Sequence, residues 1–375
     1  MTPTFDSLVA LLEHRGTTQA GKRAYTFLLD GEREGNSLTY GELRTQAHAI
    51  AATLRERGVL SGDRALLLYN PGTEFIAAFF GCLCAGVIAV PAYPPNTTQM
   101  SRALPRLLAV AGDADVAIVL CTEKIAQAGP DLAQSPSVFK QLSWLATDLI
   151  PDSTATAWSD PGAERDTLAF LQYTSGSTAA PKGVMVSHGN LLHNLGYLDF
   201  LAENDDTSVA VSWLPVIHDM GLIEGVLQPM YAGYPAVLMA PEAFLQRPVR
   251  WLEAITRYRG TNSGGPNFAF DLCVRRINAP QIAVLDLSSW RCAYNGAEPI
   301  RAETLERFHD AFRPAGFRAT SLFPVYGLAE STLIVTGGRR TDEPMRVGVD
   351  ATALTNGKVV EGTIAEQSVT IVGCG

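Results

Sequence analysis

The sequence lacks several features that would assign it to a specialised class of protein. Its six cysteines form no C-x-x-C pair, so we expect buried thiols of a reducing compartment rather than disulfides or a zinc site. The start, MTPTFDSLVALLEHRG, has no basic segment followed by an apolar one, and we expect no secretion signal. The longest apolar run, residues 75–90, is shorter than the ~20 residues of a membrane-spanning helix. These absences predict a cytoplasmic protein with no integral membrane segment.

Positive charge is also scarce. The chain has 29 Lys and Arg against 38 Asp and Glu, a formal net charge of −9, and no run of basic residues. A net acidic chain is repelled by a phosphate backbone, so we expect no nucleic-acid partner. Core-forming material is ample, because 47% of the 375 residues are hydrophobic, which is enough for two or three packed subdomains.

Helical and strand patterns alternate along the chain. Thr39 and Glu42 have the spacing of a capping box at the start of a helix that Gly58 closes, and residues 75–90 are typical of a core helix that leads into a buried strand. Further strands are expected at 64–69, 115–121, 167–173, 208–213, 235–239, 291–294 and 320–323, and helices at 100–110, 190–200, 266–277 and 301–312. This alternation predicts an α/β fold of largely parallel sheets covered by helices.

A polar stretch at residues 152–165 interrupts these patterns and is typical of a linker or surface crossing. We therefore expect a first α/β subdomain over residues 1–165 and a second over residues 166–335. The last residues, VTIVGCG at 369–375, have the pattern of a strand or its turn.

The most informative segment is residues 173–184, YTSGSTAAPKGV. It follows an expected strand, and its glycine and small hydroxyl residues allow backbone N–H groups to turn toward an anion. Lys182 can place a point charge on a phosphate. Its lysine precedes the final glycine, so this is not the GxxxxGKS/T loop. A Gly/Ser turn with a solvated lysine is the alternative.

This string resembles the phosphate-binding signature of the adenylate-forming superfamily, which includes acyl-CoA synthetases, firefly luciferase-like enzymes and peptide-synthetase adenylation domains. The resemblance implies two α/β subdomains with mostly parallel sheets flanked by helices, then the start of a barrel-like third subdomain over residues 336–375. It also implies ATP and Mg²⁺ as cofactors. The residues that would hold the triphosphate are Thr174, Ser175, Gly176, Ser177, Thr178 and Lys182, with Thr178 also near Mg²⁺.

Two further segments match that superfamily in the expected order. The segment NGAEP follows an expected strand, and the resemblance implies that Asn295, Gly296, Ala297 and Glu298 meet the adenine base. The segment YGLAE resembles the Tyr-Gly-x-x-Glu motif, which implies that Tyr326 packs on adenine beside Gly327, Leu328 and Ala329. Glu330 would bind Mg²⁺, a cation that prefers oxygen ligands. Alone, Tyr326 would be a core aromatic and Glu330 a surface charge.

The segment WLPVIHDMG places His218 and Asp219 after another expected strand. The resemblance implies that His218 lies near the reacting carboxylate and the α-phosphate. A catalytic His–Asp pair is the weaker interpretation, because adjacent side chains rarely point at each other. A carboxylate substrate is already ionised near pH 7 and needs no base. We therefore expect His218 to position the substrate, and the predicted catalytic set is Lys182, His218 and Glu330.

Longer strings, such as HDMGLIEGVLQPMYAGYP and DLSSWRCAYNGAEPIRAETLERF, resemble the fatty acyl-AMP ligases. That branch activates a medium- or long-chain fatty acid with ATP to acyl-adenylate and pyrophosphate, and transfers the acyl group to the phosphopantetheine thiol of an acyl carrier protein. Residues 337–367 occupy the place of its insertion and contain Asn356-Gly357, a tight-turn signal; a surface excursion is the alternative. The expected acyl-binding residues are His218, Asp219, Gly225, Met230, Gly264, Gly265, Phe268 and Phe270.

Two other functions stay open at this point. One is a long-chain acyl-CoA synthetase of the same superfamily, and the other is a catalytically silent module that only binds acyl or adenylate ligands. Members of the superfamily continue into a ribose-binding Asp and a C-terminal lid domain with an essential Lys. We expect these to lie outside the 375 residues, and the activity of this chain alone to be low.

Overall fold

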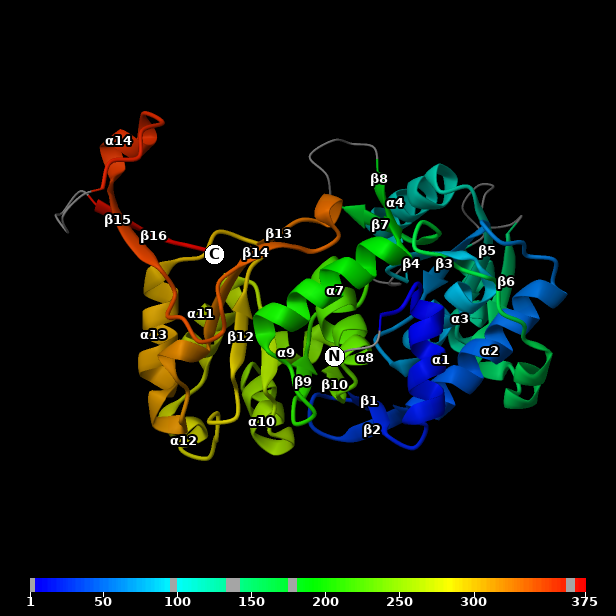
Figure 1. Cartoon of the computed structure of the whole chain (residues 1–375), viewed down its shortest axis with the longest axis horizontal. Coiled ribbons are helices and arrows are strands. Elements are labelled where there is room, and N and C mark those ends of the chain that lie inside the picture. The colour runs from blue at the N-terminus through cyan, green and yellow to red at the C-terminus, as the bar shows by residue number, and fades with distance from the viewer. Residues whose placement is uncertain (1–3, 95–99, 133–141, 175–180, 362–367) are drawn as a thin grey trace. The chain divides into compact units, whose positions relative to one another are not determined.

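The computed structural model describes residues 4–94, 100–132, 142–174, 181–361 and 368–375, whose helices and strands are labelled in Figure 1. These residues form two compact units, each assembled from several chain segments. Unit 1 comprises Met1–Leu28, Glu34–Gly196 and Pro215–Leu238, and unit 2 comprises Leu29–Arg33, Tyr197–Leu214 and Met239–Gly375. The predicted subdomain boundaries near residues 165 and 335 stay a prediction.

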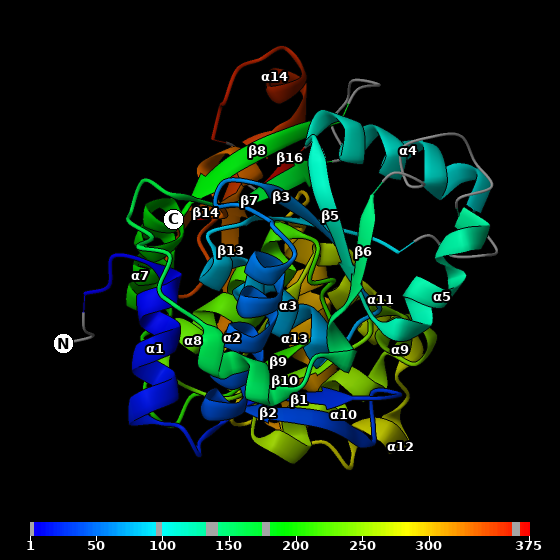
Figure 2. The same ribbon diagram turned by 90° about the vertical axis from the view of Figure 1, so that its right-hand side faces the viewer.

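The main sheet of unit 1 has the strand order β6-β5-β3-β4-β7-β8. All its pairs are parallel except the last, because β8 runs antiparallel to β7. Figure 2 shows helices α4 and α5 beside strands β5 and β6. The strands are β3 (Arg64–Leu68), β4 (Ile88–Ala92), β5 (Val116–Cys121), β6 (Ser143–Ala146), β7 (Leu168–Thr174) and β8 (Lys182–Ser187).

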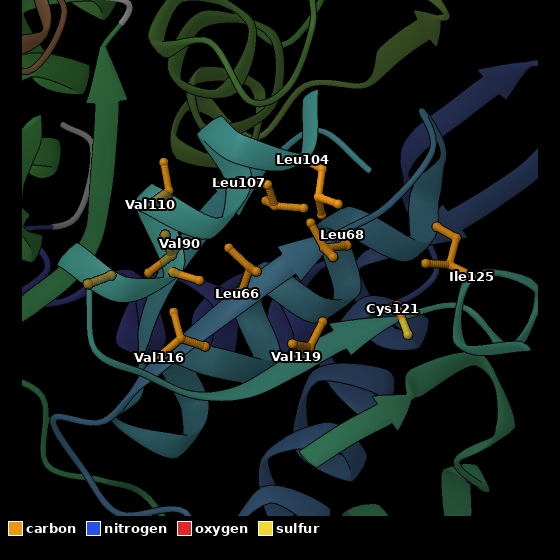
Figure 3. Close-up of a cluster of buried hydrophobic side chains, with 12 residues drawn as sticks. Leu66, Leu68, Val90, Leu104, Leu107, Val110, Val116, Val119, Cys121 and Ile125 are labelled. Carbon is orange, nitrogen blue, oxygen red and sulfur yellow. The ribbon is translucent and has the colours of Figure 1, made fainter. Parts of the chain in front are cut away.

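Helix α4 (Met100–Asp113) covers one face of this sheet. Its Leu104 and Leu107 lie over Leu68 and Leu66 of β3, respectively, in a buried hydrophobic cluster (Figure 3). Side chains alternate along a strand, so Ala65 and Leu67 point to the other face; both are fully buried, and helix α3 (Thr73–Ala85) contacts β3 and β4. Burial on both faces is typical of parallel sheets and confirms the predicted α/β fold.

The capping box predicted at Thr39 is confirmed. The Thr39 Oγ1 accepts the backbone N–H of Glu42 at 3.2 Å, and the Glu42 carboxylate accepts the N–H of Thr39 at 2.8 Å. The remaining elements of unit 1 are α1 (Leu8–Thr18), β1 (Arg23–Leu28), β2 (Glu34–Thr39), α2 (Tyr40–Glu56), α5 (Glu123–Leu132), η1 (Thr147–Leu149), η2 (Asp152–Ala157), η3 (Met220–Leu227), α8 (Gln228–Ala232) and, extending into residues of unit 2, α7 (His188–Ala202) and β10 (Ala236–Met239).

The surface crossing predicted over residues 152–165 is confirmed, since none of these residues is buried. Several contacts hold it on unit 1. The ring of Trp158 stacks on that of His48 at 3.7 Å between centroids, and its indole N–H donates to the carbonyl of Cys84 at 2.8 Å. The guanidinium of Arg55 on α2 donates to the hydroxyl of Ser159, so the crossing is fixed to the body of unit 1.

Unit 2 contains a second, largely parallel arrangement of strands. Strand β11 (Asn262–Gly265) pairs in parallel with β9 (Ala210–Ser212) and β12 (Cys292–Asn295), and β12 with β13 (Leu322–Gly327). Strand β14 (Ile334–Gly337) runs antiparallel to β13. The helical elements are α9 (Pro241–Gln246), α10 (Val249–Tyr258), α11 (Asn267–Arg276), α12 (Ala279–Ile282), α13 (Ala302–Phe312), η4 (Arg313–Ala315), η5 (Ala319–Ser321) and η6 (Ala329–Ser331).

Residues 336–375, over which the start of a barrel-like subdomain stays a prediction, contain a two-stranded antiparallel sheet, shown in red in Figure 1. It consists of β15 (Arg346–Asp350) and β16 (Ser368–Val372), with helix α14 (Ala351–Thr355) after β15. The described residues form no closed barrel.

The tight turn expected at Asn356-Gly357 is confirmed. It ends helix α14, and Gly357 has a left-handed φ of +72°. The N–H groups of Gly357 and Lys358 donate to the carbonyls of Leu354 and Ala353, the pattern by which glycine terminates a helix.

Two expectations from composition can be compared with the structure. All six cysteines are free; five are buried and Cys374 is partly exposed, which confirms the prediction of unpaired thiols. Among the described residues, no helix is both long and apolar enough to cross a membrane.

Candidate functional site

The predicted phosphate loop connects the paired strands β7 and β8 of unit 1. Thr174 ends β7 and pairs with Lys182, the first residue of β8. Lys182 is exposed, so its ammonium group can reach a phosphate. The other four predicted phosphate ligands, Ser175, Gly176, Ser177 and Thr178, lie outside the described residues.

Helix α4 supports the start of this loop through two side chains that sequence reasoning missed. The guanidinium of Arg106 donates to the carbonyl of Thr174 at 3.4 Å, and the hydroxyl of Tyr173 donates to the carboxylate of Asp113 at 2.6 Å. Arg106 and Asp113 are about two helical turns apart and therefore share a face of α4. Their partners are 68 and 60 residues away in sequence, which left no local signal.

The ring of Tyr173 also covers the far end of the loop. A Cβ atom at Gly183 would lie 2.9 Å from the Tyr173 Cζ, so glycine is needed for this close approach. Burial and the hydrogen bond to Asp113 raise the pKa of Tyr173 above its ordinary value. The Tyr173 hydroxyl therefore stays protonated and can donate to Asp113. The Tyr173 ring, at the start of the loop, packs on Gly183 just after its end.

His218 and Asp219 point at each other, and the expectation that these neighbours would not was wrong. The Nδ1 of His218 lies 2.6 Å from the Oδ1 of Asp219. Asp219 begins the helical segment η3, where its carboxylate also accepts the N–H of Met220 at 2.7 Å, and this turns it back toward the ring. The hydrogen bond to Asp219 raises the pKa of His218, against an opposing effect of burial. The His218 side chain is 56% exposed, so a ligand can reach the ring.

A π-helix follows this pair directly. Segment η3 is buried throughout and contains Gly225 and the carboxylate of Glu224, which is 8% exposed. It continues into α8, where Met230 is fully buried. π-helical turns are rare and occur frequently at functional sites. The candidate acyl residues Gly225 and Met230 therefore lie in unit 1, in the segment that His218 and Asp219 begin.

In unit 2, the structure brings the two predicted adenine motifs together around one cavity. Ala297 and Glu298 line it from the loop after β12, Tyr326 and Gly327 line it from β13, and β16 closes another side. Its volume of about 870 Å³ is in the range of small-molecule sites. Tyr326 is 53% exposed, which excludes the alternative of a core aromatic. Glu330 is exposed on η6.

The backbone of these two motifs is strained. Ala297 has a φ of +67° and Thr332, two residues after Glu330, a φ of +74°. The turn at Thr332 is tight, because the N–H of Leu333 donates to the carbonyl of Ser331 at 3.0 Å. Such conformations cost about 1–3 kcal/mol at a non-glycine residue and cluster at functional sites.

Glycines permit close contacts within the same motifs. A Cβ at Gly327 would lie 2.0 Å from the carbonyl oxygen of Leu333, and a Cβ at Gly296 would lie 2.9 Å from that of Val325. Both contacts are with backbone, which cannot move aside as a flexible side chain can. The loops therefore depend on the absence of a side chain at these positions.

Asn295, at the end of β12, is fully buried, and neither its amide oxygen nor its amide nitrogen has a partner among the described residues. A buried polar group without a partner costs about 1–3 kcal/mol and points to a ligand or water. Nearby, the carboxylate of Glu298 accepts the N–H of Phe268 at 2.6 Å, at the first turn of α11. Glu298 thereby links the cavity loop to that helix.

The other candidate acyl residues lie in unit 2. Gly264 packs against the backbone of Tyr294, and Gly265 against the ring of Trp213. Phe268 is 41% exposed, whereas Phe270 is fully buried in an aromatic cluster that includes Trp251, Trp290 and Phe308. Their roles in acyl binding stay a prediction.

The described residues contain no group of three or more His, Cys, Asp or Glu side chains placed to hold a metal ion. Mg²⁺ is usually bound by one or two carboxylates together with substrate phosphates. An exposed carboxylate such as that of Glu330 fits a Mg²⁺ ion that arrives with a nucleotide.

Comparison with known proteins gives a consistent result. The sequence model of the AMP-binding enzyme family matches residues 12–366. The chain is 46% identical over 377 residues to the medium-chain-fatty-acid–acyl-carrier-protein ligase JamA of Moorena producens, covering 100% of this chain and 64% of that protein. It is 39% identical to the 4-hydroxyphenylalkanoate adenylyltransferase of Mycobacterium marinum, covering 94% of this chain and 57% of that protein.

Among solved structures, the chain is similar to a fatty acyl-adenylate ligase from Legionella pneumophila in complex with acyl adenylate and pyrophosphate. The TM-score is 0.91 at 42% sequence identity, and the match covers 98% of this chain and 63% of that one. The chain thus spans about three fifths of the length of the curated relatives it matches.

Proposed function

The chain belongs to the AMP-binding enzyme family, and we propose that it binds ATP and a fatty acid and forms a fatty acyl-adenylate. In this reaction a carboxylate oxygen of the fatty acid bonds to the α-phosphorus of ATP, and the bond from that phosphorus to pyrophosphate breaks. We further propose that the acyl group then passes to the phosphopantetheine thiol of an acyl carrier protein, and that AMP leaves.

The observation that carries the nucleotide part of this proposal is the cavity of unit 2. Two motifs that are separate in sequence, at Ala297–Glu298 and Tyr326–Gly327, line it together. The half-exposed ring of Tyr326 offers a surface on which a purine can stack. Asn295, buried just before this loop at the end of β12, has an amide donor and acceptor with no partner among the described residues, the combination that the edge of adenine requires.

Residues of unit 1 support the phosphate part. Lys182 offers an exposed positive charge next to Thr174, and Glu330 of unit 2 is our proposed protein ligand for Mg²⁺. When bound, Mg²⁺ supplies charge neutralisation for the phosphates. Phosphoryl chemistry of this kind depends mainly on positioning and on stabilisation of charge.

His218 supports the acyl part. Its raised pKa favours the imidazolium form, whose Nδ1 donates to Asp219 and whose Nε2–H remains available as a charge-assisted donor. A carboxylate that is already ionised needs such a donor and no general base. We therefore propose that His218 orients the fatty carboxylate.

The names of the relatives support the substrate class. JamA is named for medium-chain fatty acids and an acyl carrier protein, and the Legionella structure contains acyl adenylate and pyrophosphate. The six free thiols support a cytoplasmic location.

Calorimetric titration of the chain with a non-hydrolysable dodecanoyl-adenylate analogue tests the proposal. We expect binding that ATP and dodecanoate both compete for. Lys182→Ala and Glu330→Gln are expected to weaken the binding of Mg²⁺-ATP by about tenfold each, the equivalent of ~1.4 kcal/mol.

Matched controls are Lys124→Ala on α5 and Glu164→Gln, two exposed residues outside the motifs, which should bind as the wild type does. No binding of the analogue by the folded chain would contradict the proposal. So would equal losses in the site variants and their controls.

A further inference from the structure

We propose that Gln172 is a positioning residue that couples the phosphate loop to His218. The inference rests on the proposed function, because it concerns the communication between the phosphate and acyl parts of that site. Gln172 lies on β7, two residues before Thr174, and no motif singles it out. It pairs with Val184 of β8. Gln172 therefore lies in the paired part of the two strands that flank the phosphate loop.

The side chain of Gln172 reaches the His218 segment directly. It is 5% exposed, and its Nε2 donates to the carbonyl of Ile217 at 2.9 Å, 45 residues along the chain. Ile217 immediately precedes His218. A single side chain in the interior of unit 1 therefore connects the strand that carries the phosphate loop with the segment that carries the proposed carboxylate-orienting residue.

The geometry of the peptide makes this contact effective. The carbonyl of Ile217 and the N–H of His218 belong to one planar peptide unit. At the other end of that unit, the N–H of His218 donates to the carbonyl of Pro215 at 3.0 Å. Gln172 fixes the carbonyl end, so the plane that leads into His218 is held from both sides. A shift of β7 on phosphate binding would be passed to this plane through one hydrogen bond.

The second atom of the amide indicates that Gln172 does more than fill space. Its Oε1 is buried and has no hydrogen-bond partner among the described residues. A methionine of similar size would need no partner at this position. Triphosphate and carboxylate groups offer only acceptors near neutral pH, so the donor for Oε1 is expected to be water, which commonly satisfies such groups.

The test follows the His218 ring by NMR in the chain labelled with ¹⁵N-histidine, with the signal assigned from a His218→Gln variant. Mg²⁺-pyrophosphate is titrated into the wild type, Gln172→Met and Gln172→Glu. The methionine variant keeps the side-chain length without polarity. The glutamate variant keeps length and acceptors and, at a pH at which its carboxylate is ionised, has no donor for the carbonyl of Ile217. Gln127→Met is the control, because Gln127 is exposed on α5 and its amide contacts only Glu123 in the same helix among the described contacts.

We expect pyrophosphate to shift the His218 ring signals in the wild type and in Gln127→Met. In both Gln172 variants we expect pyrophosphate to bind within about threefold of the wild-type affinity while the His218 shift falls to less than half. If the shift is unchanged in Gln172→Met, the inference is wrong. If that variant does not fold, the Gln172→Glu variant decides by the same criterion.

A ligand-free measurement separates this inference from the proposed function. If the wild type does not bind pyrophosphate, the proposed function fails, and the pKa of His218 without ligand then tests the positioning role. Loss of the Ile217 contact should loosen the alignment of His218 with Asp219, and the pKa of His218 should fall toward its ordinary value in Gln172→Met but not in Gln127→Met. An identical His218 pKa in the wild type and Gln172→Met would overturn the inference.

Discussion

The two compact units hold their candidate site residues by different means. In unit 1 the contacts are polar and made by side chains, such as the Tyr173–Asp113 hydrogen bond and the pairing of His218 with Asp219. In unit 2 the loops are shaped by backbone contacts, as at Gly327, and by an unusual conformation at Thr332. The comparison predicts that changes of charge and pH should alter stability and binding mainly through unit 1. An added side-chain atom should destabilise mainly unit 2.

Gly327→Ala should produce the largest effect and sharpens the comparison in unit 2. The new Cβ would lie 2.0 Å from the carbonyl oxygen of Leu333, and backbone must move to accommodate it. We expect a loss of about 3 kcal/mol in the free energy of unfolding, measured by urea denaturation. Gly338→Ala is the matched control, because nothing lies within 4 Å of a Cβ there. Equal urea-denaturation midpoints for Gly327→Ala and Gly338→Ala would show that the close contact at Gly327 does not limit stability.

The pH dependence of stability tests the polar character of unit 1 through His188. This residue is 1% exposed, its Nδ1 accepts the N–H of Leu8 at 3.1 Å, and burial lowers its pKa to about 4. The unfolded chain, with a histidine pKa near 6.5, binds more protons between these values. The contribution is therefore present above about pH 6.5 and is lost as the pH falls toward 4.

Between pH 7.5 and 5.5 the expected loss is about 1.4 kcal/mol. Urea denaturation at both pH values checks it, with His188→Asn, which has no ionisable ring, expected to lose less. The exposed His193→Asn is the control and should keep the wild-type dependence. The same dependence in His188→Asn would show that other groups are responsible.

Asp219→Asn should alter the pH range over which His218 binds a carboxylate. The raised pKa keeps the imidazolium present to higher pH, and removal of the carboxylate lowers that pKa. Binding of dodecanoate should therefore weaken at a lower pH in the variant, by several-fold up to about tenfold near neutral pH. Calorimetry across pH 6–8.5 measures this, with the exposed Asp152→Asn as control. Parallel pH profiles in the wild type and Asp219→Asn would argue against an imidazolium ligand.

Glu298→Gln tests a charged contact at the cavity loop of unit 2. The carboxylate accepts the N–H of Phe268 at the first turn of α11, where negative charge stabilises a helix by about 0.3–1 kcal/mol. Glutamine keeps an acceptor, so we expect a loss near the lower end of that range in urea denaturation. Glu343→Gln, at an exposed loop position, should change nothing. A loss as large as that of Gly327→Ala would break the distinction between the units.

Local sequence signals identified the elements whose formation depends on nearby residues. The capping box of Thr39 and Glu42 and the apolar strand at residues 64–69 needed only a few neighbours, and both are present. The π-helix η3 was not foreseen, because no pattern in its sequence separates it from an α-helix. The antiparallel strand β8 was also missed, since it forms by pairing with β7 across the phosphate loop.

The candidate site shows the same division. Lys182, His218, Tyr326 and Glu330 were predicted because they stand in short ordered motifs, and their roles stay a prediction. Arg106, Asp113 and Gln172 were not, since each acts on a partner 45 to 68 residues away. Such contacts depend on which strand or helix lies beside which, and a one-dimensional pattern does not contain that information.

The number of residues in the π-helix η3 determines how α8 is oriented relative to Asp219. Each residue of an α-helix turns the chain by about 100°, and a π-helix accommodates additional residues per turn. Deleting one residue between Met220 and Leu227 would allow α-helical bonding there and would leave α8, with its buried Met230, close to its present orientation relative to Asp219, because each α-helical residue turns the chain further than a π-helical one. Deleting a second residue would then turn α8 by about 100° and present a different set of side chains to the interior.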